Sequence, residues 1–184
     1  MEKVDFANKS RTTRIEGVCQ MYFSLIDKID ALIPNDSIVA TKSLSMSEEY
    51  LRDHFPKFPV MPGVLMIEAM TQASAWLIRA SESFSHSMVV LKETKNVKFG
   101  QFLQPGQTLV VTSKIISDAE KETVVKASGA IEGQTRIRAQ LTLAKYNLRD
   151  VSERQAPFDD KLRRSLKTEL QLLWNAVPPE LIAE

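Results

Sequence analysis

The run from Val64 to about Ala80 constrains the fold more than any other part of the sequence. It follows Pro62 and Gly63, contains no proline, and is apolar on nearly all sides rather than along one stripe. A proline at a helix start pre-sets the backbone angle φ, and a helix that is apolar all round must be enclosed by the rest of a soluble domain. The sequence therefore predicts one central, buried helix.

Runs typical of β-strands lie on both sides of this helix. Two precede it, at residues 21–29 and 37–46, joined by the turn-forming "IPND", and about four follow within residues 88–148. Because short turns connect consecutive strands, we predict an α+β fold in which a curved antiparallel sheet wraps the helix. The last run shows the alternation expected of a strand with one face on a core, with apolar residues Ile137, Ala139, Leu141 and Leu143.

A second helix is predicted near the C-terminus. The segment from about residue 151 begins with polar and charged residues and continues with apolar residues at helical spacing, between Asp159 and Asp160 at the start and Pro178 and Pro179 at the end. We therefore predict a main domain over residues 1–150 and a C-terminal helical extension over residues 151–184. The apolar stripe of the extension consists of Leu162, Leu166, Leu170, Leu173 and Trp174.

Composition narrows the class of protein. The 184 residues include 24 Lys and Arg against 23 Asp and Glu, and the resulting net charge of +1 gives no indication of nucleic-acid binding. A single cysteine, Cys19, excludes an internal disulfide framework and a multi-cysteine zinc site, and suits a reducing compartment. No secretory signal and no apolar run of about 18 residues is visible, so we expect a cytoplasmic protein without a membrane span.

Glu68 is the one ionisable side chain between Val64 and Ile78. Thr71 and Gln72 follow it by three and four residues, so they share its face of the helix, and the Thr71 hydroxyl is expected to contact Glu68. Apolar surroundings disfavour a charged carboxylate, so Glu68 could be held neutral and act as a proton donor.

A candidate base and candidate oxyanion donors lie close to Glu68 in the sequence. His54 sits in the proline-bracketed "HFPKFPVMP", and an imidazole is the natural partner base. The backbone amides of Gly63 and Val64, at a helix start, can polarise a carbonyl oxygen. Each feature alone has a structural explanation: a satisfied buried glutamate, a packing histidine, or a plain helix start. Together they predict an acid–base site.

The stretch "HFPKFPVMPGVLMIEAMTQ" closely resembles the active-site segment of the FabZ family, the 3-hydroxyacyl-(acyl-carrier-protein) dehydratases of type II fatty acid synthesis. Weaker similarity covers residues 20–146, where "KNVKFGQFLQPGQTL" resembles a family strand with its Pro-Gly turn. The residues that match the family motif are His54, Phe55, Pro56, Pro59, Pro62, Gly63, Val64, Leu65, Glu68, Ala69, Met70 and Gln72.

The resemblance implies a hot-dog fold that pairs into a homodimer with two active sites at the interface. It implies that His54 takes the C2 proton of a 3-hydroxyacyl thioester, that a Glu68 from the other subunit protonates the departing hydroxyl, and that the Gly63 amide stabilises the thioester oxygen. It further implies an acyl carrier protein bearing acyl-phosphopantetheine as partner, and no metal or organic cofactor. The other expected site residues are Val64, Phe55 and Gln72, with Met61, Met66, Met70 and Phe99 as candidates for the lining of an acyl tunnel.

The sequence also departs from the family pattern. Lys57 and Phe58 replace the usual residues after Pro56, and Gly100 and Gln101 stand where basic residues are usual, which suggests a specialised lipid or polyketide pathway. A thioesterase or isomerase on the same fold, and a catalytically weak acyl-binding subunit, remain as alternatives. Acyl chain length, coenzyme A against carrier protein, and assembly into a trimer of dimers stay open. The second histidine, His86, is expected in a solvated loop.

Overall fold

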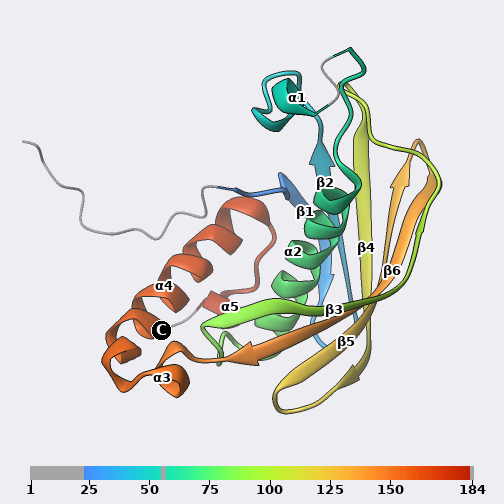
Figure 1. Cartoon of the computed structure of the whole chain (residues 1–184). Helices are drawn as coiled ribbons and strands as arrows, with labels where there is room; N and C mark the ends of the chain where they lie inside the picture. Colours follow the sequence, from blue (N-terminus) through green and yellow to red (C-terminus); the bar gives the residue numbers. More distant parts are fainter. Residues whose placement is uncertain (1–22, 55–56, 183–184) are drawn as a thin grey trace, which may run out of the picture.

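The computed structural model describes residues 23–54 and 57–182, and in them one sheet curves around a long helix (Figure 1). The six strands lie in the order β1-β2-β4-β5-β6-β3, and all neighbours are antiparallel. This confirms the predicted fold. The strands are β1 (Lys28–Ile33), β2 (Ser37–Ser43), β3 (Met88–Phe99), β4 (Thr108–Asp118), β5 (Glu122–Ile131) and β6 (Gln134–Tyr146).

The central helix α2 (Gly63–Ser81) matches the predicted helix to within one residue at each end. Its N-cap is Pro62, with φ −53°, the angle that proline pre-sets. Met66, Met70 and Trp76 are fully buried against the sheet, which explains why the run carries apolar residues on almost every side.

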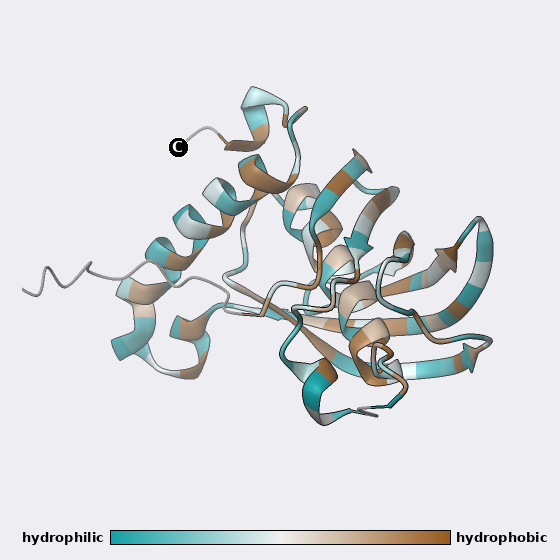
Figure 2. Ribbon diagram, turned by 90° about the horizontal axis from the view of Figure 1, so that it is seen from above, coloured by the Kyte–Doolittle hydropathy of each residue, from teal (hydrophilic) through white to brown (hydrophobic). Residues whose placement is uncertain are grey.

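The strands alternate between core and solvent as predicted, which is visible as alternating colours along the ribbons (Figure 2). Ile137 and Leu141 on β6 are fully buried, whereas Arg138 between them is exposed. A two-residue turn joins β5 to β6, with φ of 52° at Glu132 and 75° at Gly133. Two positive φ angles in succession twist a hairpin in the sense that its strands require, and glycine adopts such an angle without strain.

The first strand differs from the prediction. It begins at Lys28 rather than residue 21, although Leu25 and Ile26 are buried. The Leu25 amide donates to the Gln72 side-chain oxygen at 2.8 Å, so a helix side chain takes the place of a neighbouring strand there. An apolar run thus marked buried residues correctly but placed the strand too early.

The C-terminal region is helical and packs on the same core. It comprises α3 (Leu148–Val151), a 3-10 turn (Glu153–Gln155), α4 (Ala156–Leu173) and α5 (Pro179–Ile182). Leu166 and Leu170 of α4 are buried in the main hydrophobic cluster, which also contains residues of α2. The predicted amphipathic helix is therefore present, starting three residues before Asp159. The division into domains at residue 150 stays a prediction.

Asp159 anchors α4 to the rest of the molecule. Its carboxylate is fully buried and accepts hydrogen bonds from the Ser87 hydroxyl, the Leu148 amide at 2.8 Å, and the Arg149 amide and Nε at 3.0 Å each. Burial opposes ionisation, but these hydrogen bonds outweigh it and hold the pKa of Asp159 well below its usual range. One ionised carboxylate therefore joins α4, α3 and the residue before β3.

His86 lies in the loop between α2 and β3, where its side chain joins a partly buried polar network. Its Nδ1 is 2.8 Å from a Glu82 carboxylate oxygen, and Glu82 also accepts a hydrogen bond from the buried Lys145 ammonium. Lys145 donates to Asp118 at 2.8 Å as well. The network ties the end of α2 to β4 and β6. The expected loop at His86 is therefore confirmed, but its side chain is partly buried rather than fully solvated. No helix among the described residues is long and apolar enough to cross a membrane.

Candidate active site

Glu68 lies on the second turn of α2, half-buried, and is held by Gln72. The Gln72 side-chain nitrogen donates to one Glu68 oxygen, Oε1, at 2.9 Å and to the Phe23 carbonyl at 3.1 Å, while its oxygen accepts from the Leu25 amide. Gln72 therefore orients the carboxyl group and leaves its second oxygen for another partner. The Thr71 hydroxyl donates to the Ile67 carbonyl at 3.0 Å, and its contact with Glu68 stays a prediction.

The start of α2 presents two backbone donors. The Pro62 carbonyl accepts from the Leu65 amide at 2.9 Å and the Met66 amide at 3.2 Å, which are the first hydrogen bonds of the helix. The Gly63 and Val64 amides precede them and have no acceptor within the helix. They are therefore placed to bind an oxygen that carries developing negative charge.

Packing leaves little room for a side chain at Gly63, because the ring of Phe99 would have to shift. A Cβ atom at this position would lie 2.9 Å from the ring of Phe99 and 3.6 Å from that of Phe102. Both rings are partly exposed, at 48% for Phe99 and 44% for Phe102. The resemblance placed Gly63 and Phe99 in one site, and the structure brings them into contact across α2 and β3.

His54 follows the short helix α1 (Tyr50–Asp53), which lies above the N-terminal end of α2 in Figure 1. Its amide donates to the Tyr50 carbonyl at 3.2 Å, and its side chain is partly buried. The loop that leads to α2 is fixed at its far end by the Met61 amide, which donates to the Leu103 carbonyl at 2.9 Å. The predicted site residue Phe55 lies outside the described residues.

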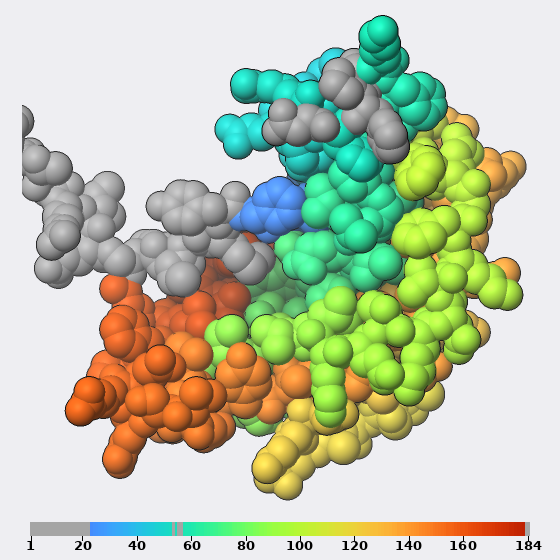
Figure 3. All heavy atoms as spheres, viewed as in Figure 1, coloured from blue at the N-terminus to red at the C-terminus, as the bar shows by residue number. Residues whose placement is uncertain are grey.

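A cavity of about 420 Å³ extends from Glu68 between α2, β3 and α4. Figure 3 shows this face hollowed between the orange atoms of α4 and the green atoms of α2 and β3. The residues that line it are Glu68, Thr71, Gln72, Ala75, Arg79, Ser87, Met88, Val89, Val90, Leu91, Leu162, Leu166 and Glu169.

The predicted tunnel methionines occupy a different place. Met61, Met66 and Met70 are fully buried in the main core and are not among the residues that line this cavity. Their role as tunnel lining stays a prediction. Reasoning from the sequence missed Arg79 and Glu169, although Arg79 lies eleven residues after Glu68, close to the same helix face.

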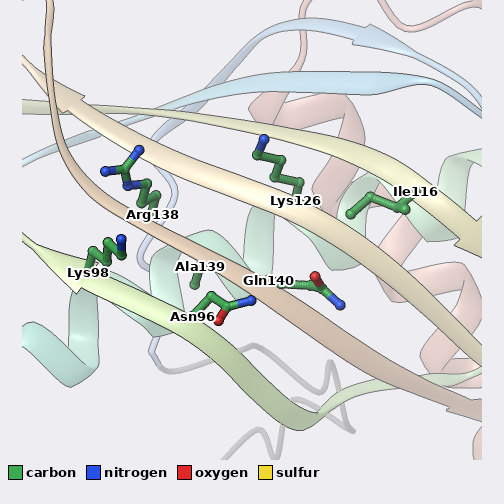
Figure 4. Close-up of a pocket in the computed structure, with 7 residues that line it drawn as sticks. All are labelled: Asn96, Lys98, Ile116, Lys126, Arg138, Ala139 and Gln140. Atoms are coloured by element: carbon green, nitrogen blue, oxygen red, sulfur yellow. The ribbon is translucent and has the colours of Figure 1, made fainter.

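Basic side chains gather at a second concave surface, on the outer face of the sheet. Figure 4 shows Lys98, Lys126 and Arg138 on the neighbouring strands β3, β5 and β6. Lys98 is the register partner of Arg138, and none of the three has an ion-pair partner within 4 Å among the described residues. We call these three residues the basic cluster.

Within residues 23–54 and 57–182, no three His, Cys, Asp or Glu side chains are grouped to hold a metal ion.

Comparisons with known proteins show the family to which the chain belongs. The family model described as a FabA-like domain matches residues 18–140. A 3-hydroxyacyl-(acyl-carrier-protein) dehydratase FabZ from Levilactobacillus brevis is 35% identical over 117 residues, which cover 64% of this chain and 79% of the relative. The FabZ of Lactococcus lactis subsp. cremoris is 34% identical over 138 residues, covering 74% of this chain and 95% of the relative.

Solved structures share the fold at lower sequence identity. The dehydratase heterocomplex ApeI:P from Xenorhabdus doucetiae superimposes with a TM-score of 0.60 at 16% identity, over 72% of this chain and 90% of that one. The protein smu.793 from Streptococcus mutans, solved bound to acetyl CoA, gives a TM-score of 0.54 at 13% identity, over 71% of this chain and 96% of that one.

Proposed function

From the premise that this chain belongs to the FabA-like family and is a FabZ-type member of it, we propose that it dehydrates (3R)-3-hydroxyacyl thioesters of acyl carrier protein. The product is a trans-2-enoyl thioester, formed in fatty acid or related lipid biosynthesis. The observation that carries the proposal is Glu68, oriented by Gln72 at 2.9 Å and facing a cavity on the helix that also presents the Gly63 and Val64 amides.

The proposed reaction is an elimination in which His54, Glu68 and the backbone amides at the start of α2 each have one role. His54 takes the proton from C2, and the charge that develops on the thioester oxygen is stabilised by the Gly63 and Val64 amides. The C3–O bond breaks as Glu68 delivers its proton to the departing hydroxyl, which leaves as water, and the C2–C3 double bond forms. Because Gln72 occupies Oε1 of Glu68, the second oxygen is the one we assign to the substrate hydroxyl.

The paired base and acid favour elimination over thioester hydrolysis. Hydrolysis would require Glu68 to activate a water molecule, and it would leave His54 without a role. The proposed dehydratase uses both residues and requires no cofactor.

We propose that the active protein is a homodimer, as the family resemblance implies. Two features support this: β3 is the last strand of the sheet, with one edge unpaired within it, and apolar side chains are exposed beside Gly63. Val64 is 70% exposed and directly follows Gly63, which lies against the partly exposed Phe99 and Phe102. Exposed apolar groups beside an open sheet edge are typical of a surface that another chain covers.

The cytoplasm, expected from the sequence, is the location we propose for this enzyme.

The first experiment is a mass-spectrometric assay of the purified protein with 3-hydroxyacyl and trans-2-enoyl carrier-protein thioesters. The expected result is interconversion of the two by loss or gain of one water. Accumulation of free acid would instead identify a thioesterase. Tight acyl binding with no turnover would identify the acyl-binding subunit, and either result would overturn the proposal.

We propose that the basic cluster docks the acyl carrier protein through complementary charge. Lys98 immediately precedes Phe99, whose ring contacts Gly63, so one member of the cluster lies on the strand that borders the site. Arg138 and Lys126 lie on the next two strands of the sheet, β6 and β5. Replacing Lys126 and Arg138 with glutamate is expected to raise KM for the carrier-protein thioester about tenfold relative to KM for a short pantetheine thioester.

Steady-state kinetics at low and high salt measures this ratio, because salt screens interactions between exposed charges. The control is Lys121→Glu, an exposed charge in the turn between β4 and β5, for which we expect the native ratio. An unchanged ratio in the double variant would exclude the basic cluster as the docking surface.

A further inference from the structure

Arg79 is a buried cation without a polar partner among the described residues. The side chain lies on α2 at 9% exposure, its Nε atom is buried and makes no hydrogen bond, and no described carboxylate lies within 4 Å of its nitrogens. Its guanidinium carbon is 5.3 Å from the centre of the Trp76 ring. Burial lowers the pKa of Arg79 to about 10, so the group still carries its charge at neutral pH.

Such an arrangement is costly in a folded protein. A buried charge is normally paired, because the lost hydration must be replaced by hydrogen bonds or by an opposite charge. The cation–π contact with Trp76 replaces only part of this. Glu169, on α4, faces the same cavity but lies too far away for a direct ion pair, and burial raises its pKa while Arg79 opposes the rise. Arg79 therefore has donors left to bind a ligand.

The cavity connects Arg79 to the proposed catalytic acid. Glu68 and Arg79 both line it, and a helix rises about 1.5 Å per residue, which separates them by roughly 16 Å along α2. Apolar side chains from three elements form the walls between these two polar ends, and they include Ala75, Val89, Leu91, Leu162 and Leu166. The shape is that of a site for an apolar chain with a polar group at each end.

We propose that this cavity binds the acyl chain of the substrate and that Arg79 binds a carboxylate at its far end, so that the preferred substrates are ω-carboxyacyl thioesters. The inference rests on the proposed function. An Arg guanidinium matches a carboxylate with two parallel hydrogen bonds. The neutral form of Glu169 can donate a further hydrogen bond to the same group. A chain that ends in a methyl group would leave Arg79 buried and unsatisfied, which is the basis of strong discrimination by polar sites.

The test compares 3-hydroxyacyl carrier-protein thioesters of one chain length that end in a carboxylate, a methyl ester or a methyl group, over several lengths. The native protein is expected to favour the carboxylate over the methyl end by at least about tenfold in kcat/KM. In Arg79→Met this ratio should fall to about one, and Arg79→Lys should keep part of it. The exposed Arg164→Met serves as the matched control and should keep the native ratio.

A binding measurement separates this inference from the proposed function. Calorimetry with decanedioic acid and decanoic acid requires no turnover, and the native protein should bind the diacid more tightly while Arg79→Met should not. The melting temperature of Arg79→Met should be no lower than that of the native protein, because a buried unpaired charge has been removed. A lower melting temperature together with an unchanged chain-end preference would show that Arg79 is structural and overturn the inference. Loss of water from no thioester would count against the proposed function alone.

Discussion

Replacing His54 with alanine, or Glu68 with glutamine, is expected to lower kcat for dehydration by about 10²–10⁴-fold. Glutamine keeps the size of Glu68 and can still accept the hydrogen bond that Gln72 donates at 2.9 Å, but it has no acidic proton to deliver. Alanine at position 54 removes the base that takes the C2 proton. Mass spectrometry of carrier-protein thioesters in samples quenched at successive times measures the dehydration rate of each variant.

The control for Glu68→Gln is Glu120→Gln, the same change at an exposed position in the turn between β4 and β5. It should keep native kcat. Equal circular dichroism spectra of the variants would show that the sheet and α2 are intact. Activity of Glu68→Gln within a few-fold of the native value would remove Glu68 from the mechanism.

Mixing the two variants tests whether a site combines residues of two subunits. If His54 of one subunit works with Glu68 of the other, a mixed dimer has one complete site and one doubly altered site. Random exchange should then restore about a quarter of native activity from two inactive proteins. If both residues act within one chain, every site in the mixture is defective and activity stays absent.

The sequence predicts the central helix and the succession of strands along the chain because both depend on local patterns, whereas the pairing of β3 with β6 was not predicted. An apolar run after Pro62 can only be a buried helix in a soluble domain, and alternation along β6 fixes which face is inside. The start of β1 was missed because Leu25 and Ile26 are buried by a contact with Gln72, which is distant in the sequence. An apolar pattern in the sequence indicates that residues are buried, but it does not indicate which element of the fold covers them.

The candidate site was predicted in part for the same reason. Glu68 and Gly63 are exceptional within their own stretch, so the sequence singles them out. Arg79 is not exceptional at the end of a helix, where a basic residue is ordinary. Its importance arises only when α4 forms a second wall of the cavity that Arg79 lines, bringing Glu169 to the same cavity. A role created by a distant helix leaves no local signal.

Asp159, which anchors α4, is predicted to contribute more to the stability of the protein than the exposed charges of this helix do. Asp159→Ala removes the acceptor shared by Ser87, Leu148 and Arg149, and hydrogen bonds to a charged, buried group are each worth about 1.5–3 kcal/mol. We therefore expect a loss of about 3 kcal/mol in the free energy of unfolding, and a melting temperature lower by about 6–12 °C. Asp160→Ala is the matched control, because Asp160 is 61% exposed and its ion pair with Arg163 should contribute at most about 1 kcal/mol.

The low pKa of Asp159 also predicts how the stability of the protein changes with pH. Because the pKa of Asp159 is lower in the folded protein than in the unfolded chain, its stabilisation is complete above the unfolded value of about 4 and disappears as pH falls through the folded value. Urea unfolding from pH 7 to pH 2 should therefore show a steeper loss of stability below pH 4 for the native protein than for Asp159→Ala. Since α4 forms one wall of the cavity, the variant should also discriminate less between chain ends at pH 7. Parallel curves for the two proteins would mean that Asp159 is not the ionised anchor of α4.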